Sequence, residues 1–144
     1  MKNLEDNKDH FYDDVRKKVI MFFESLPNVV SVYLFGSIVT GKVNKESDVD
    51  IAVVTASDKS YNQFDILQMQ EEISDTLHRK VDLVCLNLAP VVLRMQVFRK
   101  GIKIIDKNPQ ITNTLFVRTL FEYDDLMRNR APIEAKILKG RVYG

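Results

Sequence analysis

The sequence predicts an α/β (α+β) fold, in which helices flank a small mixed β-sheet, on three observations. Helix-spaced apolar residues alternate along the chain with short β-branched runs. A length of 144 residues with 28% charged residues fits one soluble core and no second catalytic domain. A loop of ten residues, 38–47, lies between the first two expected strands, so that pair can be antiparallel or offset. We therefore expect a single domain over residues 1–144, with a core at about 10–106 and a C-terminal helical extension at about 111–139.

The first expected elements are a helix and a strand. Apolar residues recur at steps of three and four over Phe11–Leu26, which indicates an amphipathic helix that Pro27 ends. The polar segment Met1–Lys8 before it is expected to be a loose end. Val29–Phe35 is rich in β-branched and aromatic residues, which favours a strand.

A loop, a strand and a helix are expected next. Ile38–Ser47 is polar enough to form the loop, and Asp48–Val54 favours the second strand. The helical spacing returns over Ile66–Leu77. We place the basic residues His78–Lys80 in the last turn of this helix, at the negative end of its dipole.

The next elements are a third strand and a short helix. Val81–Leu86 is apolar except for one acid and favours a strand. Asn87 is expected to cap a helix at about Ala89–Lys100, which Gly101 ends.

The C-terminal part is expected to hold a fourth strand and a last helix. Ile102–Ile105 favours a shorter strand. The apolar stripe of Phe116–Met127 indicates a helix, which Pro132 either kinks or follows as the start of another helix.

The composition excludes several classes of protein. Lys and Arg number 21 against 20 Asp and Glu, a net charge of +1, whereas a chain that binds nucleic acid by electrostatics alone is usually far more basic. The single cysteine cannot form an internal disulfide. The N-terminus has no apolar signal core, and no apolar run is long enough to span a membrane. We expect a cytoplasmic protein that binds neither a membrane nor nucleic acid directly.

The candidate chemistry lies in the segment from Gly36 to Asp50. Gly36 follows a strand and permits a positive φ or a close approach to a ligand, and the Ser37 hydroxyl and nearby N–H groups can hold phosphate oxygens. Asp48 and Asp50 lie two positions apart on a strand, so their carboxylates share one face. Such a pair repels at low dielectric, and a bound Mg²⁺ removes this conflict because it prefers oxygen ligands.

A third acid extends this pattern. Asp82 is the one acid in the apolar run Val81–Leu86, and an unpaired buried carboxylate is costly. If the second and third strands are neighbours, Asp82 can join Asp48 and Asp50 in a three-carboxylate site for one or two metal ions. An outward-facing acid or a salt bridge is the alternative for Asp82.

The same loop also matches most of a P-loop, from Gly36 to Gly41 and Lys42. Val43 then has no hydroxyl for Mg²⁺, and a strand follows where a P-loop needs a helix, so we set this interpretation aside. Two plainer alternatives are an ordinary turn at Gly36 and an exposed cap on an edge strand for the two aspartates.

The motif G-S-x10-D-x-D that starts at Gly36, with the later strand residue Asp82, resembles the nucleotidyltransferase superfamily that includes DNA polymerase β. The short length and the order of the elements are similar to the minimal nucleotidyltransferases (MNT domains), the MntA-type antitoxins of HEPN/MNT toxin–antitoxin pairs. The resemblance covers about residues 29–106.

The resemblance implies a nucleotidyltransferase fold and assigns roles to five residues. Gly36 and Ser37 would bind the triphosphate of ATP, the co-substrate. Asp48 and Asp50 would bind Mg²⁺, and Asp82 would complete the metal site near the attacking hydroxyl, so that all three acids are catalytic.

The resemblance also implies an activity and a partner. AMP would pass from ATP to a hydroxyl, that of a tyrosine in a HEPN ribonuclease toxin, for which this chain would be the antitoxin. The chain is too short to build a deep acceptor pocket alone, which favours an acceptor on a partner protein, in a homo- or hetero-oligomer. A non-catalytic module that masks its partner and a dimeric small-molecule nucleotidyltransferase remain alternatives. Close relatives often carry arginine at the position of Thr40. Its absence keeps the masking alternative open, although Lys42 can take the place of that arginine.

Overall fold

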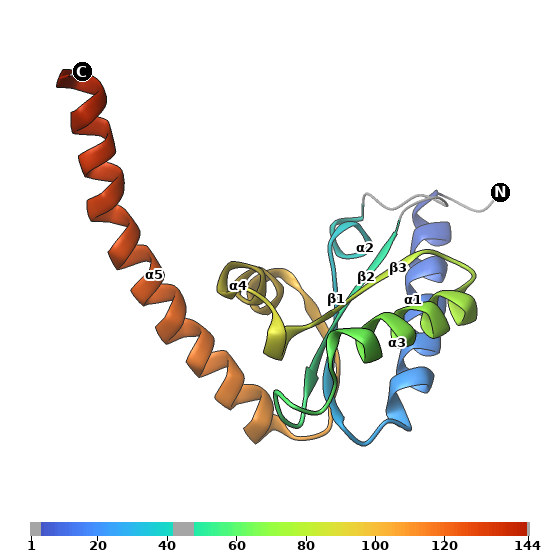
Figure 1. Cartoon of the computed structure of the whole chain (residues 1–144). Helices are drawn as coiled ribbons and strands as arrows, with labels where there is room; N and C mark the ends of the chain where they lie inside the picture. Colours follow the sequence, from blue (N-terminus) through green and yellow to red (C-terminus); the bar gives the residue numbers. More distant parts are fainter. Residues whose placement is uncertain (1–3, 42–47, 144) are drawn as a thin grey trace.

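A four-stranded sheet lies between two layers of helices in the computed structural model, which describes residues 4–41 and 48–143, with the side chains of 10–41 and 48–129. Helices α1 and α3 pack on one face, and α4 with the first turns of α5 pack on the other (Figure 1). The elements are, in chain order, α1 (Leu4–Glu24), β1 (Val29–Phe35), α2 (Ser37–Thr40), β2 (Val49–Thr55), α3 (Gln63–Leu77), β3 (Val81–Cys85), the 3₁₀ turn η1 (Leu86–Leu88), α4 (Val91–Lys100), β4 (Ile102–Asp106) and α5 (Pro109–Tyr143).

The sheet is mixed, with the strand order β3-β2-β1-β4. β1 pairs antiparallel with β2 and with β4, whereas β2 and β3 are parallel and are joined through α3. The predicted α/β fold with a small mixed sheet is confirmed, and so is the antiparallel option for the first two strands. Because β2 and β3 are parallel, their N-terminal ends lie at the same end of the sheet.

Strand β2 is buried on both faces. Val49, Ile51 and Val53 pack toward α1 and α3, while Ala52 and Val54 pack toward α4 and α5. Burial of a valine or isoleucine side chain contributes roughly 1.5–3 kcal/mol, so this strand anchors the core. The packing of β2 into the core thereby holds in place the start of the strand, where Asp48 and Asp50 lie.

Helix α1 is longer at its start than predicted. Its backbone is helical from Leu4, so the expectation of a loose end at Met1–Lys8 is wrong from that residue on. No Gly or Pro occurs between residues 4 and 24, and nothing in the local sequence stops the helix earlier. It ends at Glu24, before Pro27, and its most buried side chains include Val19 and Phe23.

Two expectations about the ends of helices are corrected. The expected loop Ile38–Ser47 begins with the helical turn α2, while its residues 42–47 lie outside the described part. Helix α3 ends at Leu77, and His78 adopts a left-handed φ of 52°. The basic residues His78–Lys80 therefore follow the helix instead of forming its last turn.

Asn87 does not cap a helix. Its side-chain oxygen accepts from the Thr55 N–H at 2.9 Å, and its amide nitrogen donates to the Thr55 carbonyl at 3.3 Å. These bonds tie η1 to the end of β2, and α4 begins only at Val91, after Pro90. Gly101 follows α4 as predicted, and its N–H donates to the Val97 carbonyl at 2.8 Å.

Helix α5 is continuous through Pro132, so the expected start of another helix there is wrong. It begins at Pro109, a first-turn position where proline loses no hydrogen bond. Its buried face includes Leu115 and Thr119, whereas Leu120 of the predicted stripe is 41% exposed. Although α5 has 35 residues, neither it nor any other helix in the described ranges is apolar enough to cross a membrane.

Candidate functional site

The turn after β1 brings Gly36 directly against Asp50. Gly36 has φ 73° and ψ −145°, a conformation that residues with a Cβ rarely adopt. A Cβ added to Gly36 would lie 3.1 Å from Cγ of Asp50 and well under 3.0 Å from its Oδ2. Glycine suits this position through its backbone angles, and a Cβ here would displace the Asp50 carboxylate.

The short helix α2 follows Gly36 and presents Ser37 at its start. Two backbone N–H groups of this turn donate to the Gly36 carbonyl at 3.1 and 3.2 Å, and Ser37 is half-buried. The Thr40 hydroxyl donates to the Ser37 carbonyl at 3.2 Å, so this side chain serves the turn itself. Lys42, which was considered as a substitute for the arginine, lies outside the described residues.

Three acids meet where β2 and β3 begin. Asp50 in β2 is the register partner of Asp82 in β3, and Asp48 stands one residue before β2. Paired strands lie about 4.8 Å apart, and residues two positions apart along a strand are separated by about 7 Å. All three residues are half-buried. The expectation that the second and third strands are neighbours is confirmed, and their register pairs Asp50 with Asp82.

The surroundings of Asp50 clearly shift the pKa of its carboxyl group. Burial raises the pKa of Asp50 above its usual 3.8, and the negative charges of Asp82 and then of Asp48 raise it further. The ionised form of Asp50 is therefore disfavoured unless a cation offsets the cluster. The Lys80 Nζ lies 3.7 Å from Oδ2 of Asp48, but the two side chains are 73% and 41% exposed, so this pair offsets little.

The acids fit a metal ion that arrives with its own ligands. Among the described residues, no group of three His, Cys, Asp or Glu side chains is arranged to hold a metal ion by itself. Mg²⁺ does not need such a cage, because it is usually bound through one or two carboxylates, waters and substrate phosphates. Asp48 and Asp50 can supply the carboxylates, and their unbalanced charge is of the sign that a cation would stabilise.

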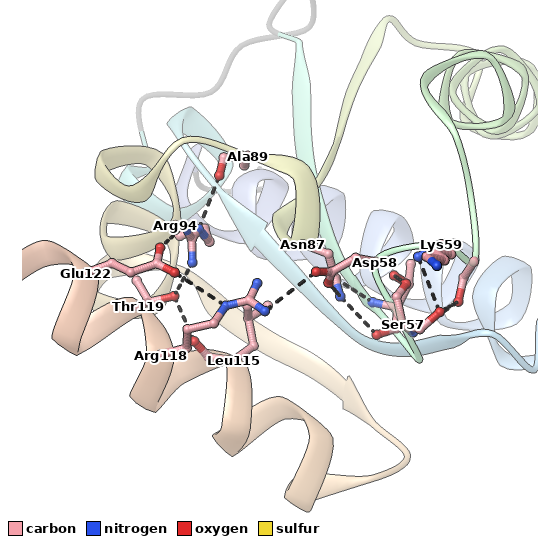
Figure 2. A network of polar contacts seen from close by, with 12 residues as sticks. Ser57, Asp58, Lys59, Asn87, Ala89, Arg94, Leu115, Arg118, Thr119 and Glu122 are labelled. Carbon is pink, nitrogen blue, oxygen red and sulfur yellow. Dashed lines mark hydrogen bonds and ion pairs between the residues drawn. The ribbon is translucent and has the colours of Figure 1, made fainter.

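A second polar cluster lies between α4 and α5 and was not predicted (Figure 2). Arg94 is buried, and it donates to the Ala89 carbonyl at 3.2 Å and to Thr119 Oγ1 at 3.1 Å. It also forms an ion pair with Glu122. We call these four residues the Arg94 cluster. The only local signal for it is a basic residue between Leu93 and Met95, because its partners on α5 are 25 and 28 positions away.

Arg118 connects this cluster to the loop after β2. Its guanidinium lies 3.6 Å from both a Glu122 oxygen and an Asp58 oxygen, and Asn87 donates to Asp58 at 3.1 Å. Arg118, Asp58 and Asn87 border a pocket of about 390 Å³ at the end of β2. The rise of a strand places Thr55 in that pocket about 17 Å from Asp50, so the pocket is separate from the three acids.

Comparison with known proteins relates most of the chain to nucleotide-transferring enzymes. Residues 17–110 match the family described as polymerase beta, nucleotidyltransferase, and this segment contains all five predicted site residues. The protein adenylyltransferase MntA of Shewanella oneidensis is 30% identical over 117 residues, which make up 81% of this chain and 82% of that protein.

Solved structures also relate this chain to chains of toxin–antitoxin complexes. A toxin–antitoxin structure with AMP-PNP superposes with a TM-score of 0.73 at 27% identity, over 85% of this chain and 98% of the other. A complex of a tri-AMPylated HEPN toxin of Shewanella oneidensis with an MNT antitoxin contains a chain that superposes with a TM-score of 0.70 at 26% identity. That superposition covers 88% of this chain and 98% of the other.

Proposed function

The chain belongs to the polymerase β nucleotidyltransferase family, and on that premise we propose that it transfers AMP from ATP to a HEPN-domain toxin and thereby acts as its antitoxin. The observation that carries this proposal is the pairing of Asp50 with Asp82 in a chain that is similar to MntA over most of its length. The similar complexes contain AMP-PNP in one case and a tri-AMPylated toxin in another. In this proposal, all 144 residues form one nucleotidyltransferase domain, and the protein acts in the cytoplasm.

Five residues hold the nucleotide and the metal in this proposal. Gly36 and Ser37 bind phosphate oxygens of ATP, and Asp48, Asp50 and Asp82 bind Mg²⁺. When bound, the metal neutralises the triphosphate and favours attack at the α-phosphorus. The contact of Gly36 with Asp50 supports this assignment, since it makes the phosphate turn and the acid pair adjacent.

The transfer breaks one phosphorus–oxygen bond and forms another. The acceptor oxygen attacks the α-phosphorus, the bond to the β-phosphate oxygen breaks, and pyrophosphate leaves with that electron pair. The hydroxyl proton passes to the Asp82 carboxylate. Asp82 is half-buried, so a hydroxyl on another protein can still reach its carboxylate. We favour a tyrosine as the acceptor, since its hydroxyl, with a pKa of about 10, loses its proton more readily than an alcohol.

Intact-mass spectrometry of the HEPN toxin, after incubation with this chain, ATP and Mg²⁺, tests the proposal. The wild-type chain should add mass in units of one AMP at substoichiometric amounts. Asp48→Asn and Asp50→Asn remove the charges that hold the metal, so transfer should fall by at least about 1,000-fold while the complex still forms. Asp14→Asn, at an exposed acid on α1, is the matched control and should transfer normally.

One result would overturn the enzymatic part of the proposal. The chain is a masking antitoxin if the wild type adds no mass to the toxin but inhibits it at a one-to-one ratio, without ATP or Mg²⁺.

A further inference from the structure

We propose that Lys80 is a built-in counter-ion of the acidic site, which pairs with Asp48 when no metal is bound and turns to the phosphates when metal and nucleotide bind. This inference rests on the proposed function and identifies a residue that sets the affinity for both. The backbone of Lys80 is fixed beside the acids, because its carbonyl accepts from the Val49 N–H at 3.0 Å. Residue 80 therefore keeps its place while its side chain moves.

The ammonium group of Lys80 is held by charge and not by a fixed hydrogen bond. Its distance of 3.7 Å from Asp48 Oδ2 exceeds hydrogen-bond range, and the side chain is 73% exposed. Lys80 also borders an open depression that Ser74, Asp75 and His78 help to form, so its side chain has space to turn. A pair of this kind is weak enough to be displaced.

Arg79, the neighbouring cation, is engaged elsewhere. Its guanidinium lies 4.0 Å from the centre of the Phe11 ring, in a cation–π contact that directs it toward α1. Within this basic segment, Lys80 forms the ion pair with Asp48.

Displacement of Lys80 has opposite effects on the two ligands. A divalent cation at Asp48 must compete with the ammonium group, so Lys80 weakens metal binding to the empty site. Once displaced, the ammonium group stays within the length of its side chain from the site and can pair with a nucleotide phosphate. Lys80 should therefore strengthen nucleotide binding and make metal and nucleotide bind cooperatively.

Calorimetric titrations of the full chain separate these two effects. Mn²⁺ is titrated into the nucleotide-free protein, and AMP-PNP is then titrated at saturating Mn²⁺. Lys80→Met should bind Mn²⁺ about two- to fivefold more tightly and AMP-PNP about two- to fivefold more weakly, the range of an exposed ion pair. Lys80→Arg keeps the charge and should stay near wild type. Lys18→Met removes a comparable exposed pair with Asp14 on α1 and should change neither affinity.

The outcomes distinguish this inference from the proposed function. If Asp48→Asn abolishes Mn²⁺ binding but Lys80→Met leaves it unchanged or weakens it, the counter-ion role is wrong and the nucleotidyltransferase site stands. If the wild-type chain binds neither Mn²⁺ nor AMP-PNP, the proposed function fails together with the inference.

Discussion

Replacing Gly36 by alanine tests the contact between the turn and the acid pair. The new Cβ would lie 3.1 Å from Cγ of Asp50 and closer still to Oδ2, so the carboxylate would have to rotate away. The substitution would also place a side chain at φ 73° and ψ −145°, which glycine adopts almost alone. The variant should therefore lose stability and displace a proposed metal ligand at once.

Gly41 provides a matched control for the magnitude. It also has a positive φ, 75°, but a Cβ there would meet nothing within 4 Å. The left-handed conformation costs a residue with a Cβ about 1–2 kcal/mol. At Gly36 the rarer conformation costs about 1–3 kcal/mol, and moving Asp50 from its rotamer adds about 0.5–1.5 kcal/mol. We expect Gly36→Ala to lower the free energy of unfolding by about 2–4 kcal/mol and Gly41→Ala by about 1–2 kcal/mol.

Urea denaturation with a double-mutant cycle isolates the contact. Asp50→Ala removes the carboxylate, so the part of the Gly36→Ala penalty that comes from the clash, about 1 kcal/mol, should disappear in the double variant. Mn²⁺ affinity should fall in Gly36→Ala and persist in Gly41→Ala. Equal losses of stability in the two glycine variants, with no coupling to Asp50, would refute the reasoning.

Two further predictions concern charges in the fold. Because the pKa of Asp50 is raised from 3.8 in the folded protein, the stability that depends on this group declines as the pH rises from that value through the folded pKa. Asp50→Asn should therefore raise the thermal midpoint of the metal-free protein at pH 7, and the gain should vanish below about pH 3.8; a lowered midpoint at pH 7 would contradict this. In the Arg94 cluster, Glu122→Ala should cost about 3 kcal/mol and Arg94→Met about 1 kcal/mol, because only the former leaves a buried guanidinium without its carboxylate. Denaturation curves that give the reverse order would show that Arg94 does not depend on Glu122.

Patterns within a few residues predicted most of the elements. The spacing over Ile66–Leu77 gave α3 its buried face, and the alternation of β2 placed Val49 and Ile51 in the core, because both follow from local backbone geometry. The five site residues could be proposed from local information as well: Gly36-Ser37 and the two aspartates stand at a fixed spacing, and Asp82 is the one acid in an apolar strand. Their roles remain predictions, although the pairing of Asp50 with Asp82 brings the acids together.

Contacts between distant residues could not be predicted. Asn87 is a good helix cap by composition, but hydrogen bonds to Thr55, 32 positions earlier, determine its place. The contact of Gly36 with Asp50 depends on the pairing of β1 with β2, and the ion pair of Arg94 with Glu122 depends on how α4 packs against α5. Such contacts arise from tertiary packing, which a single sequence does not encode in its local pattern.

The Arg94 cluster has a mechanical consequence for the long last helix. It fixes α5 to the body of the protein near Glu122, and the helical backbone continues to Tyr143, about 32 Å farther at the rise of an α-helix (Figure 1). A helix held at one end behaves as a lever, so a tilt of about 10° at the fixed point would move the other end by about 6 Å. A slight rearrangement among a few side chains at this pivot is thus converted into a displacement the size of a whole residue at the C-terminal end of the backbone.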